Sequence, residues 1–163
     1  MNPSRFIHFT QMVDTTQKCV KRLELAFAPL FGVKGVHVFW LYELQKHPDG
    51  LTAAELAHRR MVDRSLISRE MDDLKREGLV EAKTTGGRNY NVRLALTEKG
   101  REIATRIGRA ALAIQHATSD SLSEEELVAF YTTFEKIRDK LVQIAEDGTA
   151  ESIAKNLKEG SFS

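Results

Sequence analysis

The chain has 163 residues, of which 42% are hydrophobic and 29% charged, so it can bury a core and is too apolar to be a disordered chain. Its formal net charge of +1 excludes a uniformly basic surface for nucleic acid and leaves only local basic clusters. Its single cysteine, Cys19, excludes a disulfide within the monomer and suits a reducing compartment.

Apolar residues at helical spacing predict two helices at the start of the chain, over residues 4–28 and 33–45. We expect Pro29 and Gly32 to end the first of them. The second helix is apolar nearly all round, so we expect it to form the buried centre of the fold. Residues 47–50, His-Pro-Asp-Gly, predict a turn after it.

A compact region rich in capping and turn residues follows. Thr52 and Glu55 form a capping box that opens a short helix through residue 58. Asp63 can cap a second helix over residues 64–77, and Gly78 fits its end. Residues 79–84 and 90–96 predict two short strands around a glycine pair, which is the pattern of a β-hairpin.

Two long helices are predicted after the hairpin. Thr97 caps the first, which runs through about residue 118, and Ser123 with Glu126 forms a capping box for the second, which ends near residue 146. Residues 149–163 add a last short helix. The predicted fold class is mostly α with a small β-hairpin wing: a winged helix-turn-helix flanked by long N- and C-terminal dimerisation helices. Their apolar surface exceeds what one small core can cover, notably at Phe130, Phe134, Ile137 and Leu141, so we expect a homodimer.

The helix over residues 64–77 has the pattern of a DNA-reading helix. Ile67, Met71 and Leu74 share one face, which we expect to be buried, and Ser65 and Arg69 lie nearly opposite. Arginine binds guanine with two hydrogen bonds, serine can donate or accept, and a helix N-terminus favours phosphate. Leu66 can either contact a thymine methyl group or cover the scaffold helix. The predicted contacts from this helix are Arg64, Ser65, Leu66, Ser68 and Arg69.

The hairpin adds a second basic cluster, formed by Lys83, Arg88 and Arg93. A glycine-rich tip with these cations can lie against the minor groove or the adjacent phosphates. The alternative is an ordinary surface hairpin with solvated cations. The position of the hairpin directly after a helix-turn-helix favours the DNA-binding interpretation.

Five segments together resemble the MarR family of transcriptional regulators over about residues 33–141. They are Leu51–Ala57, Asp63–Arg69, Leu74–Glu81, Leu94–Gly100 and Leu122–Leu127. The resemblance implies a bacterial, sequence-specific DNA-binding repressor released by a small-molecule ligand. It also implies a two-fold homodimer on double-stranded DNA with a near-palindromic operator.

The resemblance divides the chain into an N-terminal dimerisation helix (1–32), a winged helix-turn-helix lobe (33–97) and C-terminal dimerisation helices (98–163), which form one structural domain per protomer. The wing departs from the family pattern. The family has an Asp-x-Arg motif near the wing tip, where this chain has Arg88, Asn89 and Tyr90. Arg88 can replace the arginine only from a shifted position, so the wing contacts are not fixed by the resemblance.

Many MarR-like proteins bind a small aromatic or anionic ligand between the dimer helices and the DNA-binding lobe, which shifts the population of a two-state dimer. Candidates to line such a pocket are His8, Arg22, His37, Trp40 and Tyr42, and each is equally consistent with a plain core or surface position. Cys19 allows a redox alternative, because some relatives sense peroxides through a cysteine on the first helix. A lone helical cysteine is also consistent with a small buried apolar residue.

The sequence favours neither catalysis nor a metal or cofactor. The histidines lack close ligand spacing, one cysteine cannot form a thiolate cluster, and no glycine-rich phosphate loop, nucleophile elbow or paired-carboxylate motif is present. No apolar run approaches a membrane span and residues 1–10 lack a secretory signal, so we expect a cytoplasmic protein with no membrane partner. The remaining alternative is a winged-helix protein-interaction module without DNA readout, which Arg64, Ser65, Ser68 and Arg69 disfavour.

Overall fold

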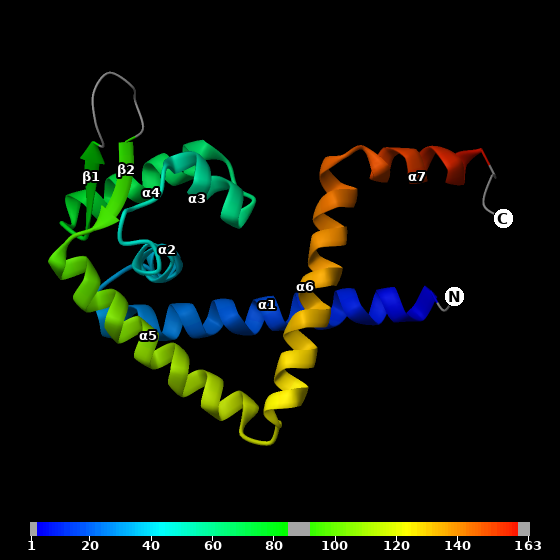
Figure 1. The fold of residues 1–163 in the computed structure, drawn as a ribbon, viewed down its shortest axis with the longest axis horizontal. Coiled ribbons are helices and arrows are strands. Elements are labelled where there is room, and N and C mark those ends of the chain that lie inside the picture. Colours follow the sequence, from blue (N-terminus) through cyan, green and yellow to red (C-terminus); the bar gives the residue numbers. More distant parts are fainter. Residues whose placement is uncertain (1–2, 85–91, 160–163) are drawn as a thin grey trace. The chain divides into compact units, whose positions relative to one another are not determined.

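The computed structural model describes residues 3–84 and 92–159, which fall into two compact units, residues 1–113 and 114–163. The first unit holds most of the elements in Figure 1: α1 (Pro3–Phe31), α2 (Gly35–Gln45), α3 (Ala53–Arg60), α4 (Arg64–Arg76), β1 (Val80–Thr84), β2 (Val92–Leu96) and most of α5 (Glu98–Ser119). The second holds the end of α5, α6 (Glu124–Glu146) and α7 (Thr149–Lys158). The predicted fold class and element order are confirmed. The division at residues 32 and 97 stays a prediction.

Local capping chemistry sets most helix starts as predicted. Thr52 and Glu55 form the capping box of α3, with hydrogen bonds of 3.2 Å and 2.7 Å. Ser123 and Glu126 do the same for α6. Thr97 accepts a hydrogen bond from the first turn of α5, from Gly100 N at 3.0 Å. Asp63 occupies the N-cap position of α4, but its side chain makes no capping hydrogen bond.

The first helix is longer than predicted, because α1 continues through Pro29 to Phe31. Proline in the last turn removes only one intrahelical hydrogen bond, and tertiary contacts hold that turn in place. Phe31 is buried in the core, and Arg106 on α5 donates to the carbonyl oxygen of Leu30 at 2.6 Å. Gly32, with φ +69°, then ends the helix, so the prediction that Pro29 ends it was wrong.

Side chains of α2, α3, α4, α5 and the hairpin form the core of the first unit. Figure 1 shows the arrangement of these elements. The central position predicted for α2 is confirmed, since Trp40, Leu41 and Leu44 are almost fully buried. Leu56 on α3 and Leu74 on α4 are fully buried against them. Each such side chain contributes about 1.5–3 kcal/mol by leaving water, which fixes the helix-turn-helix as one rigid body.

The hairpin is joined to the helix-turn-helix as well as to itself. Strands β1 and β2 pair antiparallel, with Val80 opposite Leu96 and Lys83 opposite Arg93. A further bridge joins Leu51 to Leu94, with backbone hydrogen bonds of 2.9 Å and 2.8 Å. The segment that leads into α3 therefore lies alongside β2, which places the hairpin next to the helix-turn-helix.

The helices outside the core carry large exposed apolar side chains. On α1 these include Phe6, Ile7, Met12 and Val20, and on α6 they include Phe130, Phe134, Ile137 and Leu141. Helix α6 has no buried residue.

None of the helices in residues 3–84 and 92–159 is by itself long and apolar enough to cross a membrane. One pair of helices, Ser4–Phe31 with Gly35–Gln45, has the required length and composition when the two are taken together, but it is bent by 81°.

Candidate nucleic-acid interface

Helix α4 presents one buried and one exposed face, as its sequence predicts. Ile67, Met71 and Leu74 are at most 1% exposed. Ser65, Ser68 and Arg69 are exposed. This arrangement fixes the backbone of α4 against the scaffold while its hydroxyl groups and guanidinium remain available to a ligand such as a base edge.

Two arginines in the first half of α4 have no partner among the described residues and so can bind an anion. Arg64 and Arg69 are both exposed, and neither forms an ion pair or a hydrogen bond with any residue that the structure describes. Leu66 lies between them in sequence and is half-buried. Its position on the rim of the core leaves both predicted uses of Leu66 open, as a thymine contact or as cover for the scaffold helix.

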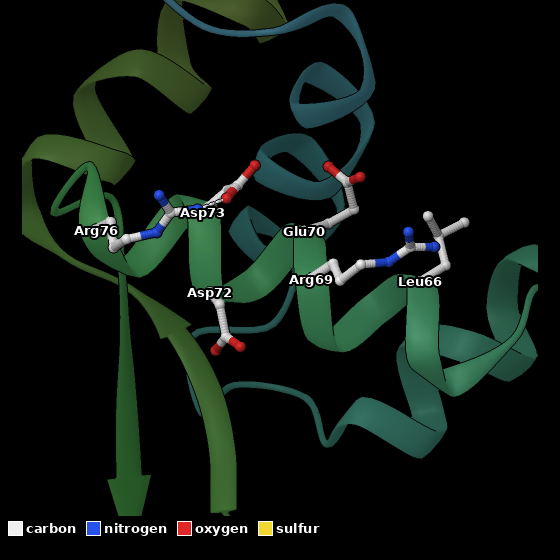
Figure 2. A pocket seen from close by; sticks show the side chains of 6 residues that line it. All are labelled: Leu66, Arg69, Glu70, Asp72, Asp73 and Arg76. Atoms are coloured by element: carbon white, nitrogen blue, oxygen red, sulfur yellow. Dashed lines mark ion pairs between the residues drawn. The ribbon is translucent and has the colours of Figure 1, made fainter.

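An open groove of about 490 Å³ follows the outer side of α4 and is lined by Leu66, Arg69, Glu70, Asp72, Asp73 and Arg76 (Figure 2). Its three acids, Glu70, Asp72 and Asp73, were not among the predicted contacts. Two of them are matched by cations: Asp73 pairs with Arg76 and Lys34, and Asp72 lies 3.3 Å from Lys75. The local charge of the groove is thereby partly neutralised, and it does not form a uniformly acidic strip.

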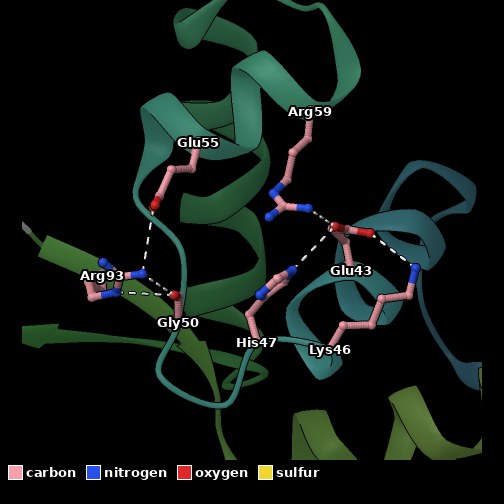
Figure 3. A network of polar contacts seen from close by, with 7 residues as sticks. All are labelled: Glu43, Lys46, His47, Gly50, Glu55, Arg59 and Arg93. Carbon is pink, nitrogen blue, oxygen red and sulfur yellow. Dashed lines mark hydrogen bonds and ion pairs between the residues drawn. The ribbon is translucent and has the colours of Figure 1, made fainter. Parts of the chain in front are cut away.

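A buried carboxylate joins α2 to α3. Glu43 is only 7% exposed, and its Oε1 accepts a hydrogen bond from Arg59 Nη1 at 2.9 Å. Lys46 and His47 also lie within 3.6 Å of its oxygens, as Figure 3 shows. A buried charge requires such partners, so this network sets how α3 sits on α2. Glu43 is the lone acid in an otherwise apolar helix, a signal in the sequence that we did not use.

Arg93 binds other residues of the same chain. Its guanidinium donates to the carbonyl oxygens of Asp49 and Gly50 at 2.9–3.2 Å and lies 3.8 Å from Glu55 (Figure 3). The capping hydrogen bonds from Thr52 hold the pKa of Glu55 below its usual value, which keeps this carboxylate ionised beside the arginine. Arg93 therefore joins the wing to the loop before α3, and a contact with DNA stays a prediction.

Of the other two predicted wing contacts, Lys83 and Arg88, the structure describes only Lys83. Lys83 is exposed, and its Nζ lies 3.9 Å from Glu81. A pair at this distance on the surface contributes little and leaves Lys83 available to phosphate. Arg88 lies outside the described residues.

The structure separates the side chains predicted to line a ligand pocket. His37 and Trp40 are buried at 0% and 1% exposure, whereas Arg22 and His8 are exposed on α1. Tyr42 is 37% exposed, and the ammonium group of Lys46 lies 4.5 Å from its ring centre. A pocket formed by these residues stays a prediction, and it would require the surroundings of His37 and Trp40 to open.

Cys19 is a free thiol that is exposed on α1 in the single chain. The alternative that it is a small buried apolar residue would therefore require a partner chain to cover it. The use of Cys19 as a redox sensor stays a prediction. Among the described residues, no three histidine, cysteine, aspartate or glutamate side chains are grouped so that they could hold a metal ion.

Comparisons with known proteins point in the same direction as the geometry of α4. The family model described as the MarR family matches residues 31–88. No match was found among curated proteins.

Solved structures match over most of the chain. A MarR family transcriptional regulator from Listeria monocytogenes complexed with 26mer DNA is 18% identical, with a TM-score of 0.76 over 94% of this chain and 96% of that one. A cysteine-to-serine mutant of MarR from E. coli complexed with operator DNA is 17% identical, with a TM-score of 0.68 over 82% and 95%. Another MarR family transcription regulator is 25% identical, with a TM-score of 0.69 over 88% and 96%.

Proposed function

We propose that this chain is a MarR-family protein and that it acts as a sequence-specific DNA-binding transcription regulator, a proposal that the family match over residues 31–88 and the likeness to MarR-family structures support. Helix α4 enters the major groove, where Arg69 contacts a guanine and Ser65 and Ser68 contact neighbouring base edges. Arg64, beside the helix N-terminus, contacts phosphate.

One observation carries this proposal. The exposed side of α4 combines two arginines and two serines that have no partner among the described residues, on a helix whose other side is fully buried. The likeness to a MarR family transcriptional regulator complexed with DNA favours base recognition over protein interaction for this face. Base recognition requires both the rigidity and the free donors.

The wing makes the accompanying backbone contacts. We infer that Lys83 and Arg88 meet phosphate or the minor groove, whereas Arg93 places the hairpin through its bonds to Gly50. Contacts to phosphate give affinity but not sequence preference. Loss of Lys83 should therefore weaken binding to all duplexes by a similar factor.

The active species is a homodimer. Several large apolar side chains are exposed on α1 and on α6 in the single chain, and a second copy of the chain would cover them. A two-fold dimer presents two copies of α4, so the operator is near-palindromic. A small aromatic or anionic ligand that binds better to a second arrangement of the dimer would release the operator, and we infer that the protein is a repressor regulated in this way.

Selection of bound duplexes from a random-sequence DNA library tests the proposal without knowledge of the operator. We expect one enriched, near-palindromic site whose affinity falls steeply as salt rises, because protein cations displace counterions from the phosphates. Weak binding that is equal on all duplexes would instead support the interaction-module alternative.

A further inference from the structure

A histidine is enclosed between the two helices that position the proposed DNA interface. His37 on α2 has no exposed surface. Its Nε2 lies 3.2 Å from Glu70 Oε2 and its Nδ1 lies 3.6 Å from Glu77 Oε2, so two carboxylates approach the ring from opposite nitrogens. Glu70 is in the middle of α4 and Glu77 is its C-cap residue. His37 thus faces both the body and the end of the helix that carries Arg69.

A neutral His37 cannot donate a hydrogen bond to both Glu70 and Glu77. A neutral imidazole has one N–H donor and one acceptor nitrogen, so only one of two carboxylates can accept from it while the other meets a lone pair. Consistently, both ring nitrogens and Glu70 Oε2 are buried without a partner in hydrogen-bond geometry among the described residues. The contacts of His37 with the two carboxylates therefore change when the ring gains a proton. Most buried contacts of the core do not change with protonation.

Burial and the neighbouring charges shift the pKa of His37 in opposite directions. Burial lowers the pKa of His37 most strongly, Glu77 and Glu70 raise it, and the ammonium of Lys34 lowers it. Lys34, which precedes α2, is itself paired with Asp73 on α4. Burial outweighs the carboxylates, so the ring is neutral in the packed state at neutral pH.

We propose that His37 is a positioning residue for α4, which keeps the DNA-reading helix packed against α2 while its ring is neutral and releases it when the ring is protonated. The inference rests on the proposed function, because its consequence is a change in DNA affinity. The geometry supports a proton-sensitive contact: the ring of His37 has no exposed surface, its two nitrogens face two carboxylates of α4, and motion of α4 would admit water to it.

The direction of the effect follows from linkage. In a loosened state the imidazole meets water and its pKa returns toward about 6.5, whereas in the packed state its pKa is lower. Protons therefore bind the loosened state better and shift the population toward it. Affinity for DNA is fully present above about pH 6.5 and falls as the pH is lowered. His58 on α3 is exposed and therefore serves as the surface control.

The test measures the dissociation constant for the selected duplex from pH 8.0 to 5.5 at constant ionic strength. Wild type, His37→Gln and the surface control His58→Gln are compared. We expect the affinity of wild type and His58→Gln to fall by up to about tenfold per pH unit below the transition, as one linked proton requires. The affinity of His37→Gln should stay flat within about twofold. Parallel pH curves for wild type and His37→Gln would overturn the proposal.

A second variant covers the case in which His37→Gln does not fold. Glu77 is 36% exposed at the end of α4, so Glu77→Gln is mild, and it removes the carboxylate that most raises the pKa of His37. Because the packed state then binds the proton still less well, we expect the affinity of Glu77→Gln to fall further than that of wild type at acid pH, and a pH curve identical to that of wild type would contradict the proposal. If every variant bound the duplex at pH 8.0 and all variants had identical pH curves, only this inference would be overturned. Absence of specific binding at any pH would overturn the proposed function itself.

Discussion

Arg93 on β2 donates two hydrogen bonds to the carbonyl oxygen of Gly50, from Nε at 3.1 Å and from Nη2 at 2.9 Å. Gly50 has φ +81°, and a side chain there would collide with the backbone of Leu94. The loop before α3 and the second wing strand therefore touch at backbone level and are joined by a guanidinium. This connection holds the wing against the helix-turn-helix.

Replacing Arg93 by alanine should destabilise the lobe. The substitution leaves the carbonyl oxygens of Asp49 and Gly50 without their donor, which costs about 1–3 kcal/mol in the free energy of unfolding. Urea denaturation measures the loss. Lys83→Ala, which removes a cation from the neighbouring strand with no short contact, should change stability by less than about 0.5 kcal/mol. Equal stability of the two variants would mean that Arg93 is an ordinary surface cation.

The local signals in the sequence predicted the elements well, because capping depends on residues three apart. Thr52 with Glu55 and Ser123 with Glu126 were identified without any knowledge of the fold. The end of α1 was misplaced because its last turn depends on Arg106, which is 76 residues away in sequence.

The same distinction applies to the candidate interface. The spacing of Ile67, Met71 and Leu74 predicts which side of α4 is buried, and hence that Ser65 and Arg69 are exposed. Periodicity does not reveal partners between elements. Neither the hydrogen bonds of Arg93 to Gly50 nor the contact of His37 with Glu70 can be inferred from spacing, because each joins segments more than 30 residues apart.

Gly100, in the first turn of α5, should not tolerate a side chain. A Cβ atom there would overlap the carbonyl oxygen of Leu79 and lie 3.3 Å from Leu96 Cδ2. Gly100→Ala should therefore push α5 away from the hairpin and lower the free energy of unfolding by about 2 kcal/mol or more.

Gly108 on the same helix provides a matched control for that substitution. A Cβ there would lie 3.7 Å from Tyr42 Cε2, an ordinary contact distance. Gly108→Ala should stabilise the protein by about 0.5–1 kcal/mol, since alanine favours helix over glycine. Thermal or urea unfolding separates the two variants. If Gly100→Ala were as stable as Gly108→Ala, the close packing of α5 on Leu79 would be wrong.

An acid on the apolar side of α6 should break the dimer. Ile137 is 39% exposed in the single chain, beside Phe134 and Leu141. Ile137→Asp places a charge that a dimer interface would have to desolvate, so light scattering at micromolar concentration should show a shift from dimer to monomer. Thr132→Asp adds the same charge on the opposite side of the helix and should remain dimeric. A monomeric wild type, or an unaffected Ile137→Asp dimer, would contradict the proposed assembly.

The central claim is that α4 reads base pairs, and the affinity of Arg69→Ala for the selected operator duplex tests it most directly. Arg109→Ala, which removes the same charge from the exposed side of α5, is the control. We predict that Arg69→Ala loses about 1–3 kcal/mol, roughly 5- to 150-fold in affinity, and loses its preference at one base position in each half-site. Arg109→Ala should keep both the affinity and the preference. Unchanged affinity and base preference in Arg69→Ala would contradict the account.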